Sequence, residues 1–206
     1  VELKARHYKL ALELKNGVIT PDEAVKTYQQ LSMIWRGESF EGEQLVQLAK
    51  AAIAAKDWRS AFTAAKRLNR AYPELDGVRP LLEDMAIRFD GLLANEGKEN
   101  IDAFEAVALF LDFRDFMPIG RRGDQLTSKL IERLVALDLI PQAADLLKYQ
   151  INNRLSVVQK PIAAIELAEL YLRDKKPIEA VRAIADTRGS GLDEGSRKAR
   201  RLIEAI

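Results

Sequence analysis

The sequence predicts an all-α protein made of a linear array of helical hairpins, an α-solenoid. Apolar residues recur at helical spacing along most of the chain, and capping residues and prolines divide this pattern into short helices. A small residue also recurs at one place in the second helix of each hairpin. These residues are Ala24, Ala61, Ala106, Ala143 and Ala180, with separations of 37, 45, 37 and 37 residues. A nearly constant period of this kind is typical of stacked helical repeats.

The first hairpin is predicted over residues 1–36. Its first helix has one apolar face and ends at Gly17, a residue type suited to the left-handed conformation that follows many helices. The start of its second helix is the clearest in the chain. Thr20 is expected as the N-cap, Pro21 at the first helical position and Glu23 three residues after the cap, which together form a capping box.

The second hairpin is predicted over residues 42–73, after a linker from Gly37 to Gly42, and the third over residues 78–117. The third is eight residues longer than its neighbours, which predicts a lengthened helix or loop. Its second helix, expected from Asn100 to Phe116, is apolar almost all round. Such a helix should be covered on both sides by flanking hairpins, and the alternative is one side exposed as a contact for another chain.

The fourth and fifth hairpins are predicted over residues 124–153 and 159–188. Asp124 is expected to cap the first helix of the fourth, and Pro177 to open the last helix of the fifth. A helix over residues 192–206 then either begins a further hairpin or caps the array. These elements predict a single helical repeat domain over residues 1–206.

The composition indicates a folded chain without a strong electrostatic preference. Of the 206 residues, 48% are hydrophobic, which is enough for a continuous core. Thirty-two basic and thirty-one acidic residues leave a formal net charge of +1, so nucleic-acid binding is not favoured. There is no cysteine, and no apolar run approaches the ~18 residues needed to cross a bilayer, so we expect no membrane insertion. Because residue 1 is Val and no signal sequence is visible, we expect a section of a longer protein of undetermined compartment.

Two stretches share a spaced pattern of apolar and small residues. Its positions are Leu167, Ala168, Tyr171 and Ala180 in residues 161–194, and Leu48, Ala49, Trp58, Ala61 and Pro73 in residues 42–75. Residues 124–157 match it at Leu130 and Ala143 only. This pattern resembles the tetratricopeptide repeat family. The repeats are atypical, because Lys56 and Lys175 replace the usual turn glycine and the period exceeds the family's ~34 residues. The whole chain also looks like uncharacterised bacterial proteins in which such repeats form one section.

The resemblance implies a right-handed superhelix whose first helices line a concave face that suits an extended peptide or a partner helix. The groove positions that it implies are Glu43, Val46, Lys50 and Ile53 in one repeat, Gln125, Ser128, Glu132 and Val135 in the next matched repeat, and Ile162, Ile165, Glu169 and Leu172 in the last. The implied function is a non-catalytic scaffold for protein–protein interaction, with a protein or peptide as partner.

No motif for catalysis or cofactor binding is present. The single histidine, His7, is accompanied by no serine in a nucleophile context, and phosphate-binding, dinucleotide-binding and zinc-protease motifs are missing from the sequence. Asp112 and Asp115 lie one helical turn apart, but two carboxylates are too few ligands for a metal site. The sequence therefore predicts a protein that is not an enzyme and uses no cofactor or metal.

Two basic elements leave alternative functions open, although a solvated turn and a solvated helix face are the favoured explanations for them. Arg121 and Arg122 lie between glycines before an expected helix, where free amide groups can hold an anion, although Asp124 already supplies negative charge at that end. Arg197 belongs to a denser basic cluster near the end of the sequence, without the aromatic residues on which bases stack. One alternative is thus a nucleic-acid or regulatory module, and another is a structural spacer or self-association segment.

Overall fold

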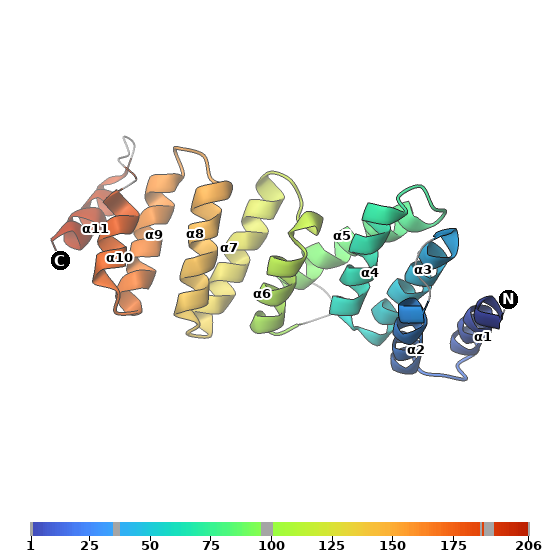
Figure 1. The fold of residues 1–206 in the computed structure, drawn as a ribbon. Coiled ribbons are helices and arrows are strands. Elements are labelled where there is room, and N and C mark those ends of the chain that lie inside the picture. Colours follow the sequence, from blue (N-terminus) through green and yellow to red (C-terminus); the bar gives the residue numbers. More distant parts are fainter. Residues whose placement is uncertain (1, 35–37, 96–100, 186, 188–191, 206) are drawn as a thin grey trace. The chain divides into compact units, whose positions relative to one another are not determined.

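The computed structural model describes residues 2–34, 38–95, 101–185, 187 and 192–205 (Figure 1). Within these ranges the chain forms eleven α-helices and one short 3-10 helix, and no β-strand. The prediction of an all-α protein is therefore confirmed.

The helices are short and are joined by short connections. Their bounds are α1 (Glu2–Lys15), α2 (Pro21–Ile34), α3 (Glu38–Ala55), α4 (Trp58–Ala71), α5 (Val78–Ala94), α6 (Ala103–Asp112), the 3-10 helix η1 (Arg114–Phe116), α7 (Arg121–Ala136), α8 (Ile140–Asn153), α9 (Lys160–Arg173), α10 (Pro177–Ala185) and α11 (Glu194–Glu204).

The chain divides into two compact units. Unit 1 consists of Val1–Phe89 and Ala108–Met117, and unit 2 of Asp90–Val107 and Pro118–Ile206, so that α5 and α6 each contribute residues to both. In unit 1, α2 packs on α1 and α3, and α3 packs on α4. In unit 2, α8 packs on α7 and α9, while α9, α10 and α11 pack on one another. Each unit is thus built from neighbouring helices in chain order, and the single domain stays a prediction.

The five periodic alanines occupy the same place in five helices. Each is fully buried, at 0% exposure. Each donates its backbone N–H, at 3.0–3.1 Å, to the carbonyl group four residues earlier, at the position that precedes the helix. These carbonyl groups belong to Thr20, Asp57, Asp102, Leu139 and Lys176. The repeated residue therefore lies in the first turn of α2, α4, α6, α8 and α10, in one register.

The turns before three of these alanines also share one geometry. Lys56, Asp138 and Lys175 have left-handed backbone angles, with φ of 59°, 57° and 59°, and each lies five residues before its alanine. In each turn, two N–H groups bond back to the end of the preceding helix in the pattern of a Schellman motif. The lysines at the turn positions therefore adopt the conformation that usually favours glycine.

The extra length of the third hairpin lies mainly in its connection. Asn95, at the end of α5, has a left-handed φ of 56° and lies 11 residues before Ala106, compared with five residues in the turns at Lys56, Asp138 and Lys175. Six of the eight additional residues therefore fall between the turn position and the buried alanine. Part of that connection, residues 96–100, lies outside the described residues.

The capping box of the first hairpin is confirmed. The Thr20 backbone N–H donates to the Glu23 carboxylate at 2.8 Å, and the Glu23 N–H donates to the Thr20 hydroxyl at 3.3 Å. The Thr20 N–H, followed by the Thr20 hydroxyl, lowers the pKa of Glu23 by donating a hydrogen bond to its carboxylate. Gly17 has φ +70° after α1, as expected for a glycine that ends a helix.

The predicted linker from Gly37 to Gly42 is wrong from Glu38 onward, because α3 begins there, and Gly37 lies outside the described residues. Glu41 and Gly42 are both buried in this helix. The Glu41 carboxylate accepts hydrogen bonds from Arg67 and from the Tyr72 hydroxyl, the latter at 2.9 Å. A Cβ at Gly42 would press against the side chains of Tyr72 and Leu75. The glycine thus serves close packing inside a helix.

The predicted helix from Asn100 to Phe116 is also wrong in its bounds. The Asp102 carboxylate accepts from the Glu105 N–H at 2.8 Å, so α6 begins at Ala103, while Asn100 lies outside the described residues. The helix ends at Asp112, and Phe116 follows in η1. The rings of Phe113 and Phe116 lie 5.4 and 5.2 Å from that of Phe62. Phe113 and Phe116 therefore contact the Phe62 ring at the point where the chain changes from the α-helix α6 to the 3-10 helix η1.

Cover on both sides of α6 was predicted, and this is wrong for one face. Phe110 and Phe113 are buried at 1% and 5% exposure, but Phe104 and Leu111 are 60% and 50% exposed. Phe104 and Leu111 are seven residues apart and therefore lie on the same face of α6. That face is therefore open within the described chain.

The C-terminal helix α11 is shorter than predicted and begins at Glu194, where the Asp193 side chain caps it by accepting from the Ser196 N–H at 2.6 Å. Its buried residue Ile203 joins a core with Ile165 and Ala168 of α9, Ala180 and Ile184 of α10, and Leu192, which precedes α11. Apolar burial against the last hairpin holds the helix in unit 2.

His7 lies in an aromatic cluster at the contacts of α1, α2 and α3. The imidazole is 2% exposed, and its centroid lies 5.3, 5.5 and 5.2 Å from the rings of Tyr8, Tyr28 and Phe40. Its Nδ1 atom has no hydrogen-bond partner in the described part of the chain. Burial lowers the pKa of His7, and the negative charge of Glu43 offsets part of this effect. The folded protein therefore favours the neutral ring.

Replacing Ala143 or Ala180 with Leu is expected to destabilise unit 2 by about 1 to 3 kcal/mol, because each alanine is fully buried and a larger side chain forces its neighbours apart. Urea unfolding followed by circular dichroism measures this change. Ala136→Leu is the matched control, since Ala136 is exposed on α7 and should change stability by less than about 0.5 kcal/mol. Equal effects at all three positions would contradict the repeat register.

His7 also predicts a pH dependence of stability. The unfolded chain binds the His7 proton near its ordinary pKa of 6.5, whereas the folded chain binds it only at lower pH. Unfolding becomes easier as pH falls below 6.5, down to the folded-state pKa. His7→Phe removes this loss, so its stability relative to wild type should rise on acidification in urea titrations. Tyr8→Phe, at an exposed neighbouring ring, should keep the wild-type slope, and a pH-independent effect of His7→Phe would refute the assignment.

Candidate functional site

A cleft of about 600 Å³ lies along α7 in unit 2, and we call it the α7 cleft. It is lined by Arg121, Arg122, Asp124, Gln125, Ser128, Lys129 and Glu132 of α7, by Gln150 of α8, and by Leu155 and Gln159 in the connection to α9. The lining is polar and carries both signs of charge. Such a surface suits hydrogen bonding to a polar ligand better than burial of an apolar one.

Three of the groove positions that the resemblance implied line this cleft. Gln125, Ser128 and Glu132 are exposed and follow one another at helical spacing on one face of α7. Val135, one turn further on, is half-buried and lies outside the lining. The predicted anion contacts Arg121 and Arg122 border the same cleft. The structure thus brings together two groups of residues that the sequence suggested separately.

The N-terminus of α7 differs from the prediction. The helix begins at Arg121, and Asp124 is not its N-cap. Gly120, with φ +77°, precedes the helix and supplies no side-chain cap. A glycine tolerates this conformation, so the chain enters the helix before it reaches Asp124. The Asp124 carboxylate instead accepts from Arg154 Nε at 2.8 Å, which joins α7 to the end of α8.

Arg122 is engaged within the protein. Its Nε and Nη2 atoms donate to the two carboxylate oxygens of Asp90 at 2.8 and 2.6 Å, a bidentate ion pair that ties α7 to the end of α5. Arg121 is exposed beside it. The anion contact stays a prediction, and Arg121 is the better placed of the two to meet a ligand.

Gln150 supports the wall of the cleft from α8. Its side chain is 4% exposed, and its amide donates to the Asp124 carbonyl at 3.2 Å and to the Ser128 hydroxyl at 3.3 Å. A buried amide with two partners is held in one orientation. Ser128 is therefore presented to the cleft from a fixed position.

Carboxylates gather at the α9 side of the cleft. Partial burial raises the pKa of Glu166, and the negative charges of Glu169 and Glu132 raise it further. Glu132 lines the cleft, and all three side chains are exposed. Along α7 the charged lining residues alternate in sign, from Arg121 and Arg122 through Asp124 and Lys129 to Glu132.

Of the remaining groove positions that the resemblance implied, some are buried and others are accessible to solvent. Val46 and Ile165 are 7% and 6% exposed, so their side chains belong to the core. The others are at least partly accessible, namely Glu43, Lys50 and Ile53 on α3 and Ile162, Glu169 and Leu172 on α9. Their role in binding stays a prediction.

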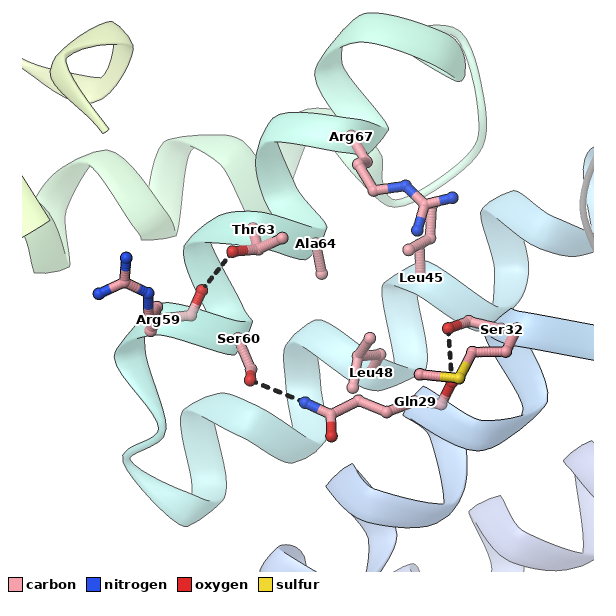
Figure 2. Close-up of a pocket in the computed structure, with 10 residues that line it drawn as sticks. Gln29, Ser32, Leu45, Leu48, Arg59, Ser60, Thr63, Ala64 and Arg67 are labelled. Carbon is pink, nitrogen blue, oxygen red and sulfur yellow. Dashed lines mark hydrogen bonds between the residues drawn. The ribbon is translucent and has the colours of Figure 1, made fainter. Parts of the chain in front are cut away.

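A second hollow, of about 380 Å³, lies in unit 1 between α2 and α4 over the side chains of α3, and we call it the α2–α4 pocket (Figure 2). Its lining consists of Gln29, Ser32 and Met33 of α2, Leu45 and Leu48 of α3, and Arg59, Ser60, Thr63, Ala64 and Arg67 of α4. The Gln29 amide donates to the Ser60 hydroxyl at 3.0 Å and bridges the two walls. Sequence reasoning missed this site, because its walls come from second helices and no single stretch marks it.

A third hollow, of about 540 Å³, borders α11 and is lined by Glu194, Arg197, Lys198 and Arg201. The basic cluster noted in the sequence is reduced here, because Arg200 does not take part. Its guanidinium donates to the Ile184 carbonyl at 2.8 Å and to the Glu204 carboxylate at 2.9 Å. Arg200 therefore ties α11 to the end of α10.

Comparison with known proteins assigns no relative. No protein-family model matches the chain, and no curated protein sequence is significantly similar to it. In the described ranges, none of the helices has the length and apolar character needed to cross a membrane. Nor do three or more histidine or acidic side chains come together there as metal ligands.

Adding one methyl group at Gly123 tests how closely the chain is packed beside the α7 cleft. A Cβ at this buried residue would overlap the Pro118 carbonyl oxygen and the Arg154 guanidinium. Gly123→Ala should therefore cost about 1 to 3 kcal/mol in urea unfolding. In Gly195→Ala the nearest atom is Asp193 Oδ1 at 3.5 Å, so this helical substitution should instead stabilise by up to about 1 kcal/mol. A neutral Gly123→Ala would refute the packing at the cleft.

Proposed function

We propose that this chain is a non-catalytic protein-interaction module of the tetratricopeptide repeat type, and that it binds an extended peptide or a partner helix in the α7 cleft. The observation that carries the proposal is the presence of Gln125, Ser128 and Glu132 together in the lining of one cleft. The proposed fold is a right-handed superhelix of stacked hairpins, supported by the common register of the five buried alanines and by the repeated turn geometry.

The chemistry of the cleft supports a polar peptide as ligand. Gln125 carries an amide group that both donates and accepts hydrogen bonds, and the Gln159 amide can donate while its oxygen accepts from Ser156, which suits the backbone of an extended chain. Arg121 favours a carboxylate at one end, and Glu132 with Glu166 and Glu169 favours a basic side chain at the other.

A nucleic-acid or regulatory role is the second candidate, because Arg197, Lys198 and Arg201 line one hollow. It has less support, since Arg122 and Arg200 are bound to groups within the protein and the chain has a formal net charge of only +1. A salt titration with labelled random DNA separates the two candidates, because phosphate contacts give a steep loss of affinity with salt. Light scattering over a range of concentrations tests the further alternative, a spacer or self-association segment.

Site-specific photo-crosslinking tests the α7 cleft. A photoreactive phenylalanine analogue at Gln125 should capture a protein partner in cells of the native host, whereas the same analogue at Gln142, an exposed glutamine of α8, should not. Gln125→Trp should then weaken binding of the purified partner by at least about tenfold, because the indole fills the cleft, and Gln142→Trp should leave it unchanged. Equal capture from both positions, or equal affinities of both variants, would count against the cleft as the binding site.

A further inference from the structure

The α2–α4 pocket carries an inference beyond the α7 cleft. Figure 2 shows the wall formed by α4, with Arg59 and Arg67 at its ends and Ser60, Thr63 and Ala64 between them. The two arginines are eight residues apart, which is about 12 Å along a helix. The residues between them are small, so this wall leaves space for side chains from outside.

Apolar side chains form the floor and the facing wall. Leu45 and Leu48 of α3 lie beneath the pocket. Met33, on α2, lines the pocket and is 74% exposed, and Ile34 beside it is 65% exposed. Methionine adapts its shape to different partners and is favoured at binding surfaces of this kind. The pocket therefore offers an apolar contact of the size of one or two side chains.

The charges of the pocket have one sign. Among the described residues, Arg59 and Arg67 are the two charged ones in the lining, and none of the described lining residues is acidic. Arg59 pairs with Asp112 through Nη2, and Arg67 pairs with Glu41 through Nη2. A guanidinium group has five N–H donors, so each arginine keeps donors for a second carboxylate. Their side chains are 67% and 45% exposed, which leaves those donors accessible.

We propose that the α2–α4 pocket is a docking site for an acidic amphipathic helix of a protein partner. Leucine-like side chains of the helix would contact Leu45, Leu48 and Met33. Two carboxylates about two turns apart would meet Arg59 and Arg67, because that spacing matches the distance along α4. The pocket is independent of the α7 cleft, and its occupant differs in charge pattern from the polar peptide proposed there.

Fluorescence anisotropy with two stapled helical peptides tests the proposal on the whole chain. One peptide carries a central pair of leucines flanked by glutamates two turns apart, and the other has lysines in place of the glutamates. The acidic peptide should bind at least about tenfold more tightly, and salt should weaken its binding. Equal affinities, or no binding of the acidic peptide up to about 1 mM, would overturn the proposal.

Variants at exposed Met33 locate the binding. Met33→Glu should weaken the acidic peptide by about tenfold and Met33→Lys should strengthen it, while Gln30→Glu, an exposed control on the same helix, should have little effect. Thermal unfolding of each variant confirms an intact fold. Gln125→Trp should leave the acidic peptide unaffected, which separates this site from the α7 cleft. If Met33→Glu leaves the affinity for the acidic peptide unchanged, the peptide binds elsewhere and the proposal is wrong. If octanoate binds as tightly as the peptide, the pocket is a site for small carboxylates instead.

Discussion

The structure depends on one fully buried alanine in the first turn of each of five helices. The alanine lies four residues after the position that precedes its helix, so its N–H closes the first turn. A larger side chain at this point would separate the packed helices, and glycine would make the first turn less stable. Because a methyl group satisfies both requirements, the same residue type recurs while the surrounding sequence varies.

The left-handed turn fixes how many residues separate the end of one helix from the buried alanine of the next. In three hairpins the turn residue lies five residues before the buried alanine, although the turn residue is Lys56, Asp138 or Lys175. None of these is the glycine that the conformation favours, so the Schellman hydrogen bonds and helix packing must outweigh the local strain of about 1 to 2 kcal/mol per residue. Tertiary packing therefore determines the turn more strongly than the preference of its residue.

The sequence predicted the repeating elements better than their ends. The small-residue period and the Thr20 capping box indicated where second helices begin, because both depend on local backbone chemistry. The errors arose where a side chain acts over a long distance. Gly42 suggested a linker but lies inside α3, against Tyr72 and Leu75, and Asp124 suggested a cap but pairs with Arg154. Neither contact leaves a signal in the nearby sequence.

The candidate sites show the same division. Positions on α7 were predictable because a helix face repeats in the sequence, and three of them line the cleft. The role of Gln150 was not predictable, since it reaches α7 from another helix. The α2–α4 pocket was missed altogether, because three helices supply its lining.

The two principal hollows differ in how the protein uses its own charges. In the α7 cleft, Arg122 and Asp124 are each neutralised by a partner within unit 2, and the exposed charges near it have both signs. In the α2–α4 pocket, the two charged residues among the described lining are both positive, and each is likewise paired within unit 1, Arg59 with Asp112 and Arg67 with Glu41. A nearly neutral chain can therefore present surfaces of different charge, and ligand choice depends on this local arrangement rather than on net charge.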